Sequence, residues 1–555
     1  MKNRLTSGFS PTFFQQRGLI ARRVAVLAYA LTASVCIAAA GDLDPKFANN
    51  GLYYFPDGIA YQIGAGLVGH GSTRQVIALA RGGYLALGGL GSGPTGSTPY
   101  GRDPTFALTS SGVLDAAFGQ AGYLPRPSAK GVYGQDAAYR YVAARELADG
   151  RLVLASEVLN KCGSPSQCQI QFSGLAYNVE RYLPNGSPDS SYGLAGSFFV
   201  DMHQGNAAIL SDGTTMALGQ TWYPLPLTGI FQYYGTSADA IVIDTAGRPV
   251  IALATQFRSQ MLRCNPSGNT QMTGAGLPVV RATPGDQVIY AYGSCMLKLN
   301  RDGTPDASFG TGGMSQLDND GLALTRVLLR KDGSIMTFSL LADGSSYRVT
   351  KRLANGAPDS SFGAAGVTAK MSLPFAPIPL YQFDGPQPYP TSVPNAHGLP
   401  ALDAQDRLLV AGYIADSGPH KQTNYIARFD PQLRLDTSFG SLGNGLAPVG
   451  NADLGLFMPL SVAVDSSNRM VFAGYLQVPN PKIPQDFAYS EALIRMQADA
   501  PASAASAGSG GCGTVGNARF DPTLGLLVAL AMMALALSQR RRSMPPALND
   551  VAIQG

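Results

Sequence analysis

The chain has 555 residues, with 66 glycines and 38 prolines, 45% hydrophobic residues and only 14% charged residues. This composition excludes a disordered or highly charged chain and is typical of a folded protein with many turns. The net charge of +4 is carried by the two ends of the chain. The nearly neutral body therefore offers no basic surface for nucleic acid, and no nucleic-acid partner is expected.

Residues 1–40 have the three-part pattern of a secretory signal peptide: basic residues, the apolar run VAVLAYALTASVCIAAA, and small residues at the end. We expect cleavage before Gly41 or Asp42, and therefore a partnership with the export machinery and transport across the inner membrane. The pair Arg22 and Arg23 also allows a twin-arginine signal, although the residues around it match that signal poorly.

A nine-residue motif, [Leu or Pro]-Asp-x-x-[Phe or Tyr]-[Gly or Ala]-x-x-Gly, occurs six times, beginning at residues 43, 114, 188, 305, 358 and 435. A degenerate copy at 262–276 keeps only the preceding turn and the final glycines, which makes seven copies. The aspartate and the aromatic residue of each intact copy are Asp44 and Phe47, Asp115 and Phe118, Asp189 and Tyr192, Asp306 and Phe309, Asp359 and Phe362, and Asp436 and Phe439.

Each copy is predicted to be a corner between strands. The turns before it use Asn-Gly or Asp-Gly, which favour tight hairpins because both central residues adopt positive φ. The aspartate is placed to accept backbone N–H groups, and the aromatic ring to fill the space beside neighbouring strands. Paired carboxylates can perform acid–base catalysis, but residues that recur once per repeat lie on a ring, far apart. We therefore expect a structural role for them.

Short β-like runs precede the corners, among them LVLASE, TMALGQ, IMTFSL, LLVAGYI and MVFAGYL. No helical periodicity is apparent in the body, so the fold class is predicted to be all-β. A unit of about four strands repeated about seven times is typical of a β-propeller. Hairpin turns near residues 80, 148, 212, 246, 285, 332, 406 and 467 number eight, whereas the corners number seven. We favour seven blades, with eight as the alternative.

Residues 403–443 contain DAQDRLLVAGYI, YIARFDPQLR and LDTSFGSLG in succession. This order resembles the bacterial delta-60 repeat family of propeller-like proteins, and the resemblance extends loosely over 42–497. It implies a propeller domain at 41–497 and a surface location, without an established enzymatic activity.

The first and last repeats are incomplete in opposite ways. The last hairpin, at 455–497, has no corner after it, and the first corner, at 43–56, has no hairpin before it. We predict that 43–56 completes the blade formed mainly by 455–497, so that the N-terminal strand closes the ring and covers an open sheet edge.

The sequence contains no clear catalytic or metal-binding pattern. The four histidines, His70, His203, His397 and His420, have no metal-ligand spacing, so no metal, cofactor or catalytic residue is predicted. By length alone, the segments 157–175, 221–238 and 371–398 are candidate functional loops.

Five cysteines remain after removal of the signal peptide. In an exported protein, Cys162 and Cys168 are candidates for one disulfide, and Cys264 and Cys295 for a second that links neighbouring blades. Cys512 is left over and is a candidate for processing or attachment.

The C-terminus begins with an Ala/Ser/Gly linker at 498–511, followed by a segment at 512–542 and a tail at 543–555. The segment contains GGCG, FDPTL, an apolar stretch within 524–538 and three arginines. It resembles the bacterial CTERM sorting signals, which implies a processing protease and display at the cell surface or outer envelope. A simple membrane anchor through 524–538 is the alternative.

The leading hypothesis is an exported, surface-associated propeller that acts as a non-catalytic binding or structural envelope protein, with an unidentified protein or glycan as its ligand. The alternative is a secreted propeller hydrolase or lyase that acts on a glycan or lactone through carboxylates lining the channel.

Overall fold

The structure is a computed structural model. It describes residues 40–54, 61–62, 75–88, 105–125, 138–159, 176–200, 203–221, 237–250, 279–318, 324–341, 343, 345–368, 370–377, 400–415, 422–451, 455–479 and 487–499, all within the compact unit Met1–Ala507. These residues form strands and turns and contain no helix, so a membrane-spanning helix does not occur among them. The predicted signal peptide and C-terminal segment lie outside the described residues.

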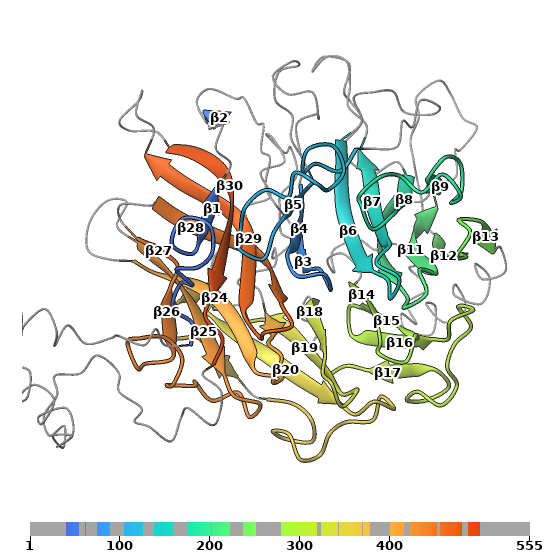
Figure 1. Ribbon diagram of the computed structural model, residues 1–555. Coiled ribbons are helices and arrows are strands. Elements are labelled where there is room, and N and C mark those ends of the chain that lie inside the picture. Colours follow the sequence, from blue (N-terminus) through green and yellow to red (C-terminus); the bar gives the residue numbers. More distant parts are fainter. Residues whose placement is uncertain are drawn as a thin grey trace, which may run out of the picture. The chain divides into compact units, whose positions relative to one another are not determined.

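Seven antiparallel sheets are arranged as blades around an axis (Figure 1). Blade 1 contains β3 (Gln75–Ala78), β4 (Tyr84–Leu87) and β5 (Phe106–Leu108). Blade 2 contains β6 (Ala138–Glu146), β7 (Leu152–Leu159), β8 (Ala176–Tyr182) and β9 (Ser197–Val200). Blade 3 contains β10 (His203–Ile209), β11 (Thr215–Thr221), β12 (Ser237–Ile243) and β13 (Pro249–Val250). Blade 4 contains β14 (Val279–Ala282), β15 (Val288–Tyr292), β16 (Cys295–Leu299) and β17 (Met314–Gln316).

The remaining blades continue in chain order. Blade 5 contains β18 (Leu324–Leu329), β19 (Ile335–Leu340), β20 (Ser346–Arg352) and β21 (Met371–Ser372). Blade 6 contains β22 (Ala376–Pro377), β23 (Ala401–Leu402), β24 (Leu408–Ala415), β25 (Gln422–Phe429) and β26 (Leu446–Pro448). Blade 7 contains β27 (Gly450–Asn451), β28 (Gly455–Val464), β29 (Met470–Pro479) and β30 (Phe487–Met496), together with β1 (Leu52–Tyr54) and β2 (Tyr61–Gln62) from the N-terminal part of the chain. The predicted all-β propeller is confirmed.

Apolar side chains on both faces of the second strands explain their continuous hydrophobic runs. In β7, Val153 and Ala155 pack against blade 3, whereas Leu152 and Leu154 pack against blade 1. One such cluster lies between each pair of neighbouring blades in the described part of the chain. Because each sheet is covered on both faces, its strands do not need to alternate with polar residues.

The number of blades is seven, and the alternative of eight is wrong. The supposed extra hairpin near residue 246 is the turn from Asp244 to Gly247, which joins the third and fourth strands of blade 3. A Cβ on Gly247 would lie 3.1 Å from the ring of Tyr192 in blade 2. Likewise, a Cβ on the turn glycine Gly186 of blade 2 would lie 2.8 Å from the ring of Phe118 in blade 1. The turn at 246 therefore belongs to an outer corner, and its resemblance to a hairpin misled the count.

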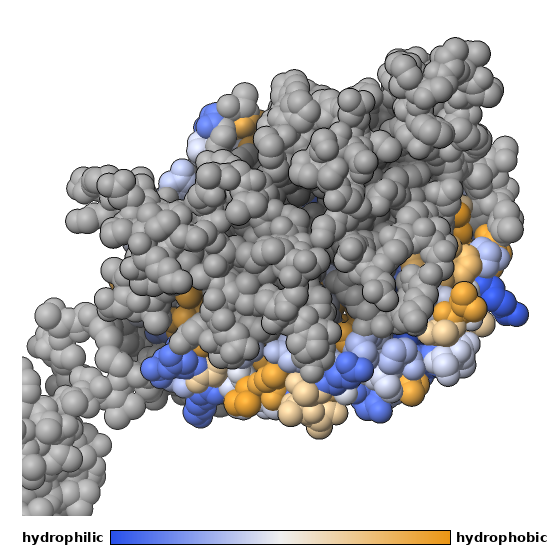
Figure 2. Space-filling view, turned by 90° about the horizontal axis from the view of Figure 1, so that it is seen from above, coloured by the Kyte–Doolittle hydropathy of each residue, from blue (hydrophilic) through white to orange (hydrophobic). Residues whose placement is uncertain are grey.

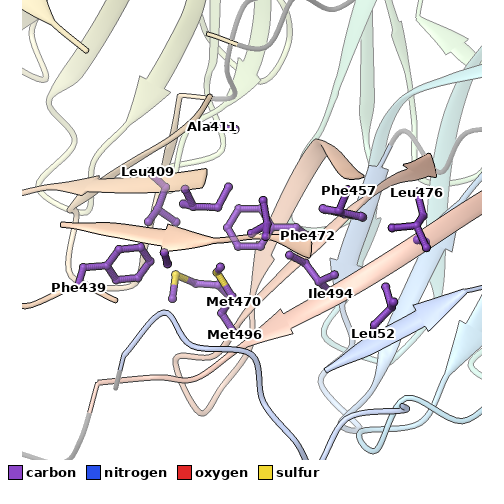
Figure 3. Packing of buried hydrophobic residues seen from close by; sticks show 14 residues of the cluster. Leu52, Leu409, Ala411, Phe439, Phe457, Met470, Phe472, Leu476, Ile494 and Met496 are labelled. Atoms are coloured by element: carbon purple, nitrogen blue, oxygen red, sulfur yellow. The ribbon is translucent and has the colours of Figure 1, made fainter. Parts of the chain in front are cut away.

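The N-terminal strand closes the ring, as predicted. β1 pairs with β30 in antiparallel register, with Leu52 opposite Ile494. Leu52 lies in the cluster between blades 6 and 7, near Phe472 and Ile494 (Figure 3). Phe47 lies in the next cluster, between blades 7 and 1. Residues from the beginning of the chain thus fill both faces of the last blade.

The two ends of the described chain also form one turn together. The Gln497 N–H donates to Asp42 O at 2.8 Å, and the Gly41 N–H donates to Gln497 O at 3.2 Å. In blade 2, Leu183 donates to Ser187 O and Gly186 donates to Leu183 O, both at 2.8 Å, within one continuous turn. Blade 7 therefore has the same outer turn, divided between residues far apart in the sequence.

Deletion of 42–56 is expected to lower the melting temperature of the whole domain, because it leaves the edge of β30 unpaired and opens two hydrophobic clusters. Thermal unfolding followed by circular dichroism measures this. An unchanged transition in the truncated protein would contradict closure by the N-terminal strand.

The Gly41→Ala substitution is expected to destabilise the domain more than Gly82→Ala. Both glycines have positive φ, +91° and +80°, so both variants carry a backbone cost of about 1–2 kcal/mol. A Cβ on Gly41 would also lie 2.5 Å from Cε2 of buried Phe439, whereas a Cβ on Gly82 meets nothing within 4 Å. Urea unfolding of the two variants measures the difference in the free energy of unfolding. Equal losses would contradict the close packing of Gly41 against Phe439 in the turn that residues 41–42 form with Gln497.

Candidate functional site

The aspartates of the described corners each form an ion pair with a basic side chain of the same blade. In four blades this partner lies on the third strand, eight residues before the aspartate: Arg181–Asp189 (2.7 Å), Lys298–Asp306 (3.4 Å), Lys351–Asp359 (2.7 Å) and Arg428–Asp436 (2.8 Å). In blade 7 the partners are Arg495 and Asp44, at 2.8 Å, although they lie near opposite ends of the described part of the chain. The corner carboxylates are therefore engaged separately and do not converge.

The corner aromatics lie against the same basic groups. The guanidinium carbon of Arg428 lies 4.5 Å from the ring centroid of Phe439, and that of Arg495 lies 4.7 Å from the centroid of Phe47. Cation–π contacts of this kind are stronger where the groups are removed from water. The remaining pairs are Arg181 with Tyr192, Lys298 with Phe309 and Lys351 with Phe362.

Blade 1 uses a different residue for the same purpose. Ala107 stands where the other blades have the basic residue, since the Asp115 N–H donates to Ala107 O just as the Asp189 N–H donates to Arg181 O. Arg81, from the turn between β3 and β4, instead reaches Asp115 at 3.0 Å. Arg81 also lies over Phe118, at 4.8 Å from the centroid. Replacement by a residue from this turn indicates that the corner requires a cation.

Several corners also link one blade to the next. Arg181 of blade 2 donates to Thr245 O in the outer turn of blade 3, and Arg495 of blade 7 donates to Ser110 O in the outer turn of blade 1. In blade 6, Arg428 instead contacts the carboxylate of Asp499, at 2.9 Å, where Arg181 and Arg495 contact a backbone carbonyl of the next blade. Sequence reasoning missed these basic residues. Four of them stand eight residues before the aspartate, and this constant spacing could have identified them.

The ion pair of blade 5 changes the titration of its carboxyl group. The hydrogen bond from the Lys351 ammonium, followed by that from the Ser361 hydroxyl, lowers the pKa of Asp359 to about 2. Hydrogen bonds from Ser308 likewise lower the pKa of Asp306. Each carboxylate stabilises the fold when it is ionised, because its folded pKa lies below its unfolded value near 4.

The stability contributed by Asp359 is therefore expected to be complete above about pH 4 and to disappear as the pH falls through its folded pKa near 2. The melting temperatures of wild type and Asp359→Asn should differ at pH 6 and approach each other toward pH 2. A difference that is independent of pH would contradict this assignment.

The other residues considered from the sequence contribute little to a described site. Cys295 is buried at the start of β16 and is disulfide-bonded. Its predicted partner Cys264, and also Cys162, Cys168 and Cys512, lie outside the described residues, so these pairings stay predictions. Most of the three candidate loops, and His70, His397 and His420, lie there too. Among the described residues, no group of three or more His, Cys, Asp or Glu side chains could hold a metal ion.

The first strands of the blades lie nearest the axis, because they contact the first strands of neighbouring blades: β10 contacts β6 and β14, β14 contacts β18, and β3 contacts β6 and β28. Seven first strands, β3, β6, β10, β14, β18, β23 and β28, contain four arginines and a single acidic residue, Glu146. The described inner strands thus contain more basic than acidic residues.

Two of these arginines, Arg281 on β14 and Arg326 on β18, belong to adjacent blades and are partly exposed. Removal from water lowers the pKa of Arg281 to about 10, and the charge of Arg326 lowers it further. Removal from water also lowers the pKa of Arg326. Sequence reasoning missed this pair because the two residues are far apart in the chain and the body has scattered charges of both signs.

The surface visible in Figure 2 shows no continuous apolar patch in its described part, where hydrophilic and hydrophobic residues are interspersed. The large hydrophobic residues that are most exposed, Val113, Leu194 and Leu442, lie singly in different corners. Isolated exposed apolar residues are normal on soluble surfaces.

No protein-family model matches the chain, and no curated protein matches it. Prolyl oligopeptidase B from Galerina marginata, bound to a 35mer hydrolysis and macrocyclization substrate, is 9% identical, with a TM-score of 0.39, over 76% of this chain and 52% of its own. The Trypanosoma rangeli sialidase in complex with the inhibitor DANA is 11% identical, with a TM-score of 0.31, over 80% of this chain and 59% of its own.

A third solved structure, polysaccharide lyase Uly1, is 7% identical, with a TM-score of 0.34, over 83% of this chain and 98% of its own. This chain spans about half the length of the Galerina marginata protein that it resembles. At these identities and TM-scores, the likenesses assign neither an activity nor a substrate to this chain.

Proposed function

We propose that this protein is an exported, surface-associated β-propeller that acts as a non-catalytic binding or structural component of the cell envelope. The resemblance of 42–497 to the delta-60 repeat family, the secretory pattern of 1–40 and the CTERM-like segment at 512–542 support export and surface display. In this proposal a processing protease acts near Cys512, and the propeller is the part exposed to ligands.

The observation that carries the non-catalytic part of the proposal is the use of the acidic residues. The carboxylates of the described corners are held in ion pairs within their own blades. On the inner strand β6, Glu146 accepts a hydrogen bond from the Ala80 N–H at 2.5 Å. Acid–base hydrolysis of a glycan uses two carboxyl groups that face each other across the bond to be cleaved, and the described residues favour binding over that arrangement.

A binding screen with the purified full chain tests the proposal. We expect retention on an immobilised envelope polysaccharide or envelope protein, without release of reducing ends or new double bonds from the polysaccharide. Chemical cleavage of the bound polysaccharide would contradict the non-catalytic reading and favour the rival hydrolase or lyase. Heat-denatured protein is the control for nonspecific adsorption.

A further inference from the structure

Ala40 stands at the end of the secretory pattern in the sequence, but in the structure it forms part of the propeller. Its carbonyl accepts the Gly440 N–H at 2.7 Å. Gly440 is buried and directly follows the corner aromatic of blade 6. The same bond joins other corners to the outer turn of the next blade: Gly119 N–H to Asn185 O at 2.7 Å, Gly193 N–H to Ala246 O at 2.9 Å, Gly310 N–H to Asn355 O at 2.7 Å and Ala48 N–H to Ser111 O at 2.7 Å. Ala40 therefore supplies, between blades 6 and 7, a bond that recurs at other blade junctions.

The residues after Ala40 contact the same corner of blade 6. Gly41 lies against the ring of Phe439, and Asp42 accepts the Ser441 N–H at 3.1 Å. Ala40 itself packs against the hydrophobic cluster between blades 6 and 7. Without Ala40, the buried Gly440 N–H would lose its acceptor, and an unpaired backbone donor in the interior is unfavourable. The folded propeller thus begins no later than Ala40.

This placement bears on the bond that removal of a signal peptide would break. A signal peptide is cleaved after small residues at the first and third positions before the bond. The bonds expected from the sequence, after Ala40 or after Gly41, leave Ala40 on the discarded peptide. Cys36 and Ala38 have the same spacing of two small residues, closer to the N-terminus. Cleavage between Ala38 and Ala39 fits the small-residue pattern and also keeps Ala40 with the propeller.

One other bond near this position would spare Ala40, the bond between Ala39 and Ala40. It has Ile37 at the third position before it, and this branched side chain departs from the small-residue pattern. We propose that the chain is cleaved between Ala38 and Ala39, so that Ala39 is the first residue of the mature protein. In this step a membrane-bound signal peptidase directs water to the peptide bond, Ala38 keeps the new carboxylate, and Ala39 keeps the nitrogen as an ammonium group. The inference rests on the proposed export and names the processing site that export requires.

The N-terminal sequence and the intact mass of the exported protein test this site, after production of the full chain in a secreting bacterial host. We expect the mature chain to begin at Ala39. A first residue of Ala40, Gly41 or Asp42 would overturn the inference and leave the proposed export intact. A chain that still begins at Met1 would contradict both.

A matched pair of variants separates the proposed bond from the bond after Ala40, with mass spectrometry of newly synthesised chains as the readout. Cys36→Phe keeps the run apolar but places a bulky ring at the third position before the proposed bond. Ala40→Phe places the same ring directly before the rival bond and outside the small-residue positions of the proposed one. We expect Cys36→Phe to reduce the yield of chains that begin at Ala39 at least tenfold, and Ala40→Phe to leave that yield unchanged. Loss of processing in Ala40→Phe, with normal processing in Cys36→Phe, would overturn the proposal.

Discussion

The ion pair between Arg495 and Asp44 is the interaction on which the closed ring depends. Both groups are buried, at 1% and 4% side-chain exposure, and they lie 2.8 Å apart although they are far apart in the sequence. Arg495 also donates to the Tyr84 hydroxyl at 3.2 Å, and that hydroxyl donates to Asp465 at 2.7 Å. Burial is the main cause that raises the pKa of Tyr84 to about 12, so this group remains a neutral donor. One polar network thus joins blade 7, the N-terminal segment and blade 1.

The same contacts among an aspartate, a cation and an aromatic ring recur in other blades and explain why the nine-residue motif is repeated. The aspartate binds the cation, the cation covers the aromatic ring, and the ring fills a gap beside the glycine of the next outer turn. A buried cation without its partner would be strongly destabilising, so the three residue types depend on one another. Arg81, which replaces the missing third-strand cation of blade 1, shows that the charge is needed more than its position in the sequence.

The described cations of the propeller fall into two groups. The cations of the described corners are matched by aspartates and tie the blades together, whereas Arg281 and Arg326 on the inner strands have no carboxylate partner among the described residues. Among the described inner strands, Glu146 on β6 is the single acidic residue.

The sequence alone was sufficient for the all-β class, the corners and the closure of the last blade by the first corner, because these follow from local turn chemistry and from counting repeated pieces. It left the blade number open, since the turn at Asp244–Gly247 and a true hairpin turn use the same residues, and only packing against Tyr192 separates them. Only the tertiary structure revealed that residues 40–42 and Gln497 form one turn. It also showed that β14 and β18, which carry Arg281 and Arg326, contact each other. Such pairings between distant parts of a chain arise from the circular arrangement of the blades, and local sequence patterns do not encode them.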